Sequence, residues 1–197
     1  MMDDTNRLSA DAQAEEVRLL EAVAAGEEAA FEVLFRRYFE GVYRYLVRVV
    51  RNDAMAEEIA NETLIDVWRG AAKFRGDSKV STWIFSIAHN KAVSELRKKR
   101  LAYDSLDQGI EVADDDDPAD SMAEMDEAAA ILRRCMDRLS PAHREVMELA
   151  YYQEMSIAEV SDVMSVPSNT VKTRMFHGRK QLRACVEGAG LSAGDEG

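Results

Sequence analysis

The stretch from 167 to 183, PSNTVKTRMFHGRKQLR, holds five Lys or Arg residues and neither Asp nor Glu. If it is helical, at roughly 100° per residue, one face is polar and cationic. The side chains on that face are Lys172, Thr173, Phe176, Lys180 and Arg183, with His177 on its flank. Cations pair with phosphates and guanine edges, and an exposed phenyl ring can meet a thymine methyl group. The side chains on this face are therefore suited to binding in a DNA major groove. The alternative interpretation is an ordinary basic helix face that contacts only solvent.

Local signals indicate the elements that hold this face. Pro167 ends the preceding element, and Ser168 or Asn169 can cap the first turn of a new helix. The residues predicted to be buried on its other side are Val171, Met175, Gly178 and Leu182.

Upstream, Ser156 and Glu159 have the spacing of a capping box, ahead of an apolar stripe of Ile157, Val160 and Met164. A short turn then leads directly into the basic helix. The pattern predicts a helix-turn-helix.

A second basic segment, GAAKFRGDSKVST, interrupts a helical pattern between 70 and 82. It combines Lys73, Arg75 and Lys79 with Phe74, and a helix from Trp83 to about Arg100 follows it. Aromatic rings beside cations suit a single-stranded nucleic-acid site, where bases stack or enter a pocket. An ordinary connection between helices is the alternative interpretation.

The preceding helices are predicted over 12–25, 28–51 and 54–69. The outer surface of the last one is largely acidic, with Glu57, Glu58, Asn61, Glu62, Ile65 and Asp66. The pattern alone favours a solvated helix face there.

Composition indicates an all-α protein of 197 residues with two small helical domains. We expect residues 1–11 to be disordered and, since no run of about 18 apolar residues occurs, a cytoplasmic protein without membrane insertion. Cys135 and Cys185 lack metal-ligand spacing, and we expect both to be reduced. No catalytic constellation is present, so we expect no enzymatic activity, no cofactor and no metal.

The net charge of −12 is concentrated in one segment: residues 101–127 contain eleven Asp or Glu and no Lys or Arg. Outside this segment the charges nearly balance, with the other 26 of the 37 acidic residues against 25 basic residues. The run from Asp114 to Asp117 repels itself, which predicts an extended linker over 101–122 between domains at 12–100 and 123–187, with a loose tail over 188–197.

Three motifs carry a resemblance to a family: AEEIANETLIDVWRGAAKFRGDSKVSTWIFSIAHNKA, LSPAHREVMELAYYQEMSIAEV and VPSNTVKTRMFHGRKQLR. Residues 30–100 resemble region 2 of bacterial RNA polymerase sigma factors, and residues 139–186 resemble region 4. The absence of a region 3 resembles the extracytoplasmic-function (ECF) class.

The resemblance implies three interfaces. Glu58, Asn61, Glu62 and Asp66 would dock on the clamp helices of the largest polymerase subunit, and the flap of the second-largest subunit is a further implied contact. The −10 element would be held by Phe74, Arg75, Asp77, Ser78, Lys79, Ser81, Asn90 and Lys91. The −35 element would be read by Lys172, Thr173, Phe176 and His177, with Arg174 and Arg179 on phosphates or fixing the helix.

The resemblance also implies an anti-sigma factor as a partner. His177 stands where an arginine is common in the family, so one base contact would differ. Two rivals remain at this point: a sigma-like decoy that binds only an anti-sigma protein, and a dimeric helix-turn-helix repressor with palindromic half-sites.

Overall fold

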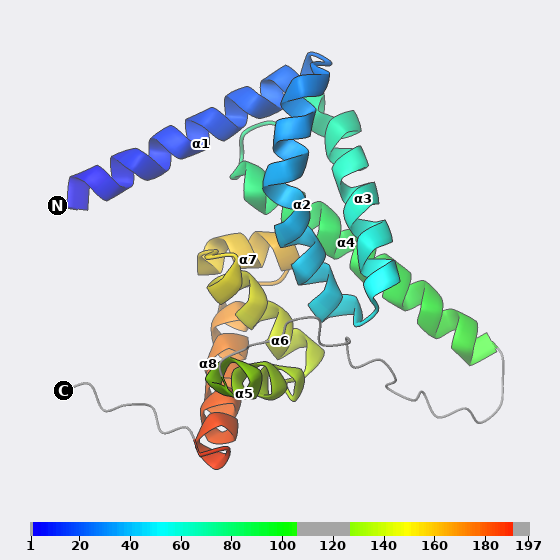
Figure 1. Cartoon of the computed structure of the whole chain (residues 1–197), viewed down its shortest axis with the longest axis vertical. Helices are drawn as coiled ribbons and strands as arrows, with labels where there is room; N and C mark the ends of the chain where they lie inside the picture. The colour runs from blue at the N-terminus through cyan, green and yellow to red at the C-terminus, as the bar shows by residue number, and fades with distance from the viewer. Residues whose placement is uncertain (1, 106–126, 191–197) are drawn as a thin grey trace. The chain divides into compact units, whose positions relative to one another are not determined.

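The computed structural model describes residues 2–105 and 127–190, with the surroundings of side chains described for 11–101 and 127–190. Every regular element within those ranges is helical, which confirms the all-α fold class (Figure 1). The helices form two compact units, one built on α1 to α4 and the other on α5 to α8.

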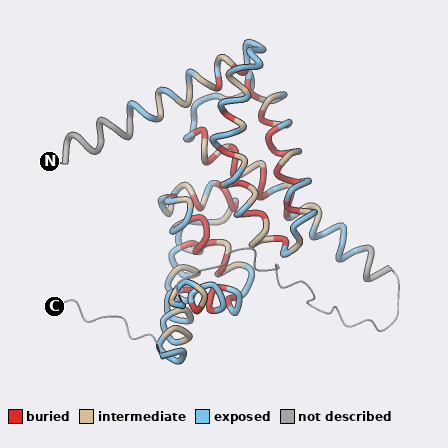
Figure 2. Tube along the Cα trace, in the orientation of Figure 1, coloured by how far each residue is buried: buried red, intermediate tan, exposed pale blue. Residues whose placement is uncertain are grey.

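The first unit is a helical bundle in which α2 packs on α1, α3 and α4. Its elements are α1 (Met2–Ala24), α2 (Glu28–Val50), α3 (Asp53–Gly70), the 3-10 turn η1 (Ala71–Lys73) and α4 (Val80–Ser105). Asn52 caps α3 by accepting a hydrogen bond from the Met55 N–H at 2.8 Å. Buried residues lie along the parts of these helices that face one another (Figure 2), and Leu34, Tyr45, Leu64 and Ile84 are inaccessible to solvent.

The second unit contains the predicted helix-turn-helix. Its elements are α5 (Glu127–Asp137), α6 (Pro141–Met147), the π-helical turn η2 (Glu148–Tyr152), α7 (Ile157–Met164) and α8 (Ser168–Gly188). The capping box is formed: the Ser156 N–H donates to Glu159, and the Glu159 N–H donates to the Ser156 hydroxyl. In the turn after α7, the Ser161 hydroxyl donates to the Val166 carbonyl at 2.6 Å.

A buried arginine holds the end of α5. The Arg144 guanidinium donates to the carbonyls of Met136, Asp137 and Leu139 at 3.2, 2.8 and 3.0 Å. These carbonyls belong to the last turn of α5 and to the residues after it, where no following helical turn supplies N–H donors. Arg144 therefore fixes the position of α6, which packs on α8, relative to α5.

Arg144→Leu is expected to lower the free energy of unfolding of the second unit by about 3 kcal/mol, because it strands buried carbonyls. Denaturant unfolding followed by circular dichroism measures the loss. The exposed Arg134 on α5 supplies the control: Arg134→Leu should change stability by less than about 0.5 kcal/mol. If the two variants lose the same stability, the contacts of Arg144 with the three carbonyls contribute no more to folding than an exposed arginine does.

Several sequence-based expectations need correction. Helix α1 begins at Met2, whereas disorder was expected over 1–11; Arg7, Leu8 and Ala10 are the favourable helix formers in this segment. Helix α4 continues to Ser105, into the expected linker, and the remainder of the linker and residues 191–197 lie outside the described residues. Pro167 occupies the N-cap position of α8, and neither Ser168 nor Asn169 caps it.

The cysteine prediction was wrong. Cys135 on α5 and Cys185 on α8 form a disulfide, with 5.7 Å between their Cα atoms. Fifty positions separate them in the chain, and only the packing of α5 against α8 brings them together. No helix in the described residues is long and apolar enough to cross a membrane.

Candidate polymerase and DNA interfaces

The four residues expected to dock on polymerase lie on one side of α3. Glu58 and Glu62 are exposed, and Asn61 and Asp66 are half-buried. The Asn61 side-chain amide donates to the Glu57 carbonyl at 3.0 Å, which holds it against its own helix. The carboxylates are therefore the groups on this face that are best placed to meet a cationic partner.

Lys91 of α4 joins this acidic face. Its ammonium lies 3.1 Å from a Glu62 oxygen and 2.8 Å from an Asp66 oxygen. Burial opposes the charge on Lys91, but its hydrogen bonds to Asp66 and Glu62 outweigh burial, and the pKa of Lys91 is raised above its ordinary value. A residue expected at the −10 element is thus paired with two residues expected at the polymerase.

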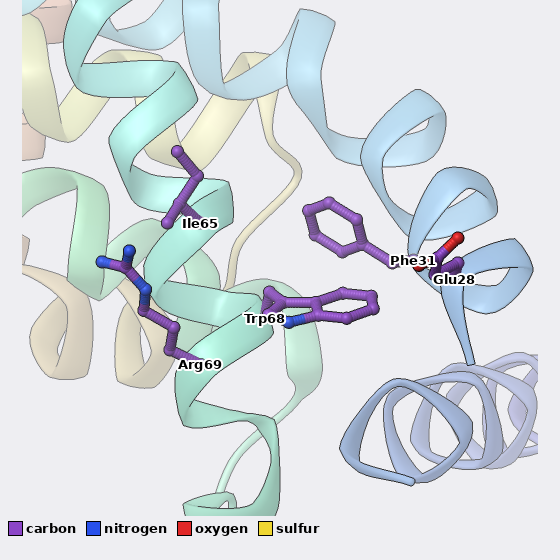
Figure 3. A pocket seen from close by; sticks show the side chains of 5 residues that line it. All are labelled: Glu28, Phe31, Ile65, Trp68 and Arg69. Carbon is purple, nitrogen blue, oxygen red and sulfur yellow. The ribbon is translucent and has the colours of Figure 1, made fainter. Parts of the chain in front are cut away.

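An apolar pocket of about 510 Å³ opens beside the same face, between the start of α2 and the end of α3 (Figure 3). Phe31 and Trp68 form its aromatic wall, with ring centroids 4.7 Å apart in an edge-to-face arrangement. Ile65, 43% exposed, lies on the other side of the opening. No role was expected for this pocket from the sequence, although an isoleucine within an acidic outer face was a usable signal.

The −10 loop lies between η1 and α4. Phe74 packs against Trp83 with ring centroids 5.3 Å apart, so its ring is half-buried. Gly76 adopts φ +76°, a left-handed conformation that a side chain disfavours. The turn there brings the exposed Arg75 guanidinium within 3.0 Å of Asp77.

The remaining −10 candidates surround the start and the middle of α4. Lys79 and Asn90 are exposed, whereas Ser78 and Ser81 are half-buried. The Ser78 hydroxyl donates to the Lys79 carbonyl at 3.3 Å. The loop thus presents cations and polar groups around a partly covered phenylalanine.

Helix α8 buries two of the four residues of the predicted stripe, and the other two, Met175 and Leu182, are half-buried. Val171 and Gly178 are buried, and Leu182 packs on the cluster of Met136, Leu139 and Met147. A Cβ atom built on Gly178 would come within 3.1 Å of the Met147 side chain, so glycine allows the close approach of α6. The opposite side of α8 is left open.

That open side carries the predicted −35 residues. Lys172, Thr173, His177 and Arg179 are exposed, and Arg174 is half-buried. Phe176, 61% exposed, borders a shallow depression of about 270 Å³ with Arg179, Lys180 and Arg183.

Two contacts orient side chains on this side of α8. The Thr173 hydroxyl donates to the Asn169 carbonyl at 2.9 Å, which leaves its oxygen lone pairs as acceptors. The His177 ring stacks near His143 of α6, with centroids 6.0 Å apart. An apolar ring flanked by cations and hydroxyls is therefore available to a duplex groove.

The described residues contain no group of three or more His, Cys, Asp or Glu side chains arranged to hold a metal ion.

Comparison with known proteins places these faces in a family. Residues 34–102 match the model of sigma-70 region 2, and residues 129–182 match sigma-70 region 4. The chain is also similar to two relatives named ECF RNA polymerase sigma factor SigK. The protein from Mycolicibacterium vanbaalenii is 31% identical over 176 residues, covering 85% of this chain and 87% of the relative. That from Mycobacterium tuberculosis H37Ra is 31% identical over 185 residues, covering 92% and 96%.

The chain belongs to the ECF sigma factors. As an alternative sigma factor, it binds core RNA polymerase and directs it to promoter DNA. The region 2 match contains every candidate docking and −10 residue, and the region 4 match contains every candidate −35 residue.

Solved structures agree with the fold of this ECF sigma factor. It is similar to the sigma factor RpoE, solved with the anti-sigma factor NepR from Bartonella quintana, with a TM-score of 0.65 and 22% identity, covering 80% of this chain and 96% of that one. It is also similar to CnrH, solved with the cytosolic domain of CnrY, with a TM-score of 0.63 and 20% identity, covering 87% and 97%.

Proposed function

We propose that the two domains, 12–100 and 123–187, divide promoter recognition between them. Glu58, Asn61, Glu62 and Asp66 dock on the clamp helices of the largest subunit, and the loop after η1, together with Asn90 and Lys91 on α4, holds the −10 element. Helix α8 reads the −35 element as duplex DNA. The observation that carries the proposal is the cationic open side of α8, with Phe176 61% exposed, in a chain whose net charge is −12.

The energetics favour this division. Each good base contact in the groove contributes roughly 1–3 kcal/mol. Unstacking a base at the −10 element costs a few kcal/mol, which contacts to Phe74 and the surrounding cations must offset. Two modest sites act together when a third body fixes their separation, and polymerase supplies that body.

Further proposals follow from family membership. An anti-sigma factor holds the protein inactive, in line with the neighbours solved as complexes with NepR and CnrY. The flap of the second-largest subunit contacts the second domain, and the protein acts in the cytoplasm without enzymatic activity. A decoy for an anti-sigma protein is the second candidate, but it has no need of a cationic open side on α8.

Transcription with purified components tests the proposal. The protein and core polymerase should initiate from a promoter selected out of a random DNA library, and neither should do so alone. DNA binding that is equally tight without polymerase would support the repressor instead, and failure to initiate from any selected sequence would support the decoy.

Lys172→Ala with Phe176→Ala is expected to weaken use of a −35 element by about 10- to 100-fold, because base contacts are lost while core affinity is retained. Run-off transcription from promoters with and without the element measures the effect. Leu132→Ala with Arg134→Ala removes an exposed apolar side chain and an exposed cation from α5, and should change neither quantity. Lost core binding in the α8 variant would refute this assignment of faces.

A further inference from the structure

Lys91 lies where two of the proposed interfaces meet. The residue before it, Asn90, is exposed on α4, on the side assigned to the −10 element. The Lys91 ammonium, however, is held by Glu62 and Asp66 of α3, at 3.1 and 2.8 Å. One side chain thus connects the docking carboxylates to the DNA-binding helix.

The charges in this cluster do not balance. Two carboxylates share one ammonium, and the Lys91 side chain is 23% exposed, whereas those of Glu62 and Asp66 are 54% and 42% exposed. The carboxylates therefore keep a net negative charge and open surface for an incoming cation. Lys91 itself is withdrawn from DNA as long as both pairs are formed.

We propose that Lys91 serves two interfaces in turn. Cations of the polymerase that bind Glu62 and Asp66 displace the Lys91 ammonium, which then pairs with a phosphate of the −10 strand. The inference rests on the proposed function of α3 and α4 and adds an order of events to it: docking on polymerase makes one further cation available to DNA.

Three physical features support the exchange. Like charges cannot crowd around the same carboxylates without repulsion, so an incoming cation weakens the hold on Lys91. Ion pairs as exposed as these are weak and are readily exchanged. Lysine carries its point charge on a flexible four-carbon stem, and it can turn away without moving α4.

Neutralising the carboxylates should release Lys91 without polymerase. The test measures binding of the isolated full-length protein to a fluorescein-labelled mixed-sequence single-stranded DNA 20-mer by anisotropy, over a range of salt concentrations. Four proteins form a cycle: the wild type, Glu62→Gln with Asp66→Asn, Lys91→Gln, and the triple variant. In the background that contains Lys91, the carboxylate changes should steepen the slope of log affinity against log salt by about 0.7, the value for one phosphate contact on a single strand.

The cycle separates release of Lys91 from a general change in charge. Removing two negative charges strengthens DNA binding whether or not Lys91 is present, so affinity alone does not report its release. The change in salt slope is therefore measured in both backgrounds, and in the Lys91→Gln background the carboxylate changes should leave the slope unaltered. Asp53→Asn with Glu57→Gln removes two exposed charges from the same helix and should not steepen the slope either. Equal steepening with and without Lys91, or none in either, would overturn the inference.

The holoenzyme provides a second readout. Lys91→Gln should assemble with core polymerase at least as tightly as the wild type, because no ammonium then competes for Glu62 and Asp66, yet its promoter complexes should lose about 0.7 from the salt slope. Lys91→Arg should restore the slope because it keeps the charge. Lost assembly with an unchanged slope would mean that Lys91 only shapes the docking face, which overturns this inference and leaves the proposed function standing; failure of the α8 variants would instead count against the proposed function.

Discussion

Glu62→Lys combined with Asp66→Lys is expected to weaken assembly with core RNA polymerase by at least about 100-fold. Both carboxylates lie on the open side of α3, four residues apart, and one cationic surface can meet them together. Reversing each charge replaces an attraction with a repulsion across the interface, at a cost of about 2–5 kcal/mol where the pair is desolvated. The same change also places two ammonium groups beside Lys91, which drives that side chain outward.

The control for this variant reverses two other paired glutamates. Glu32 and Glu40 lie on α2, each paired with the arginine four residues later, and both are exposed. Glu32→Lys with Glu40→Lys therefore makes the same change in net charge and breaks a comparable number of ion pairs. Fluorescence titration of labelled core polymerase, with a thermal melt of each protein, should show lost assembly only for the α3 variant. If the α3 variant is folded and still assembles normally, the docking face does not lie on α3.

Features that depend on neighbouring residues were predictable from the sequence. The capping box of Ser156 and Glu159, the turn before α8 and the buried stripe through Val171 and Gly178 all arise within a few residues of chain. Helical periodicity also places Phe176 on the open side of α8, where it is found. Local propensity and the 3.6-residue period carry this information without any knowledge of the tertiary structure.

Features that join distant segments were not predictable in this way. Lys91 and its carboxylate partners come from different helices, as do Phe31 and Trp68 at the mouth of the apolar pocket. Periodicity assigns a residue to a face but does not tell which residue of another helix it will meet. The roles of the loop and of the α3 face came from resemblance to a family, since their composition alone fitted a solvated surface equally well.

The disulfide is the clearest case of a contact set by tertiary packing, and its loss should have a large effect. Breaking the bond between Cys135 and Cys185 is expected to lower the free energy of unfolding of the second unit by about 4 kcal/mol. The bond closes a loop with a sequence separation of 50, and closing a loop of that length removes much of the conformational freedom of the unfolded chain. A unit of this small size has little core with which to compensate.

The distribution of tryptophan allows the two units to be followed separately. Both tryptophans, Trp68 and Trp83, belong to the first unit, so their fluorescence reports its unfolding, while far-ultraviolet circular dichroism reports both units. Urea unfolding with and without dithiothreitol should leave the fluorescence transition in place and move a second dichroism transition to lower urea.

Cys185→Ala serves as the control for the reductant. It breaks the bond at the half-buried end and spares the buried Cys135 site, so its unfolding should coincide with that of the reduced wild type and should not respond to dithiothreitol. A second transition that stays in place under reduction would show that the bond does not form in solution.

If the transition moves as expected, the second unit of a reduced protein depends on the packing of Leu182 against Met136, Leu139 and Met147, and on the Arg144 contacts that hold α5. Combining Arg144→Leu with reduction should then unfold the second unit at urea concentrations that either change alone withstands, because two losses of this size approach the whole stability of a small domain.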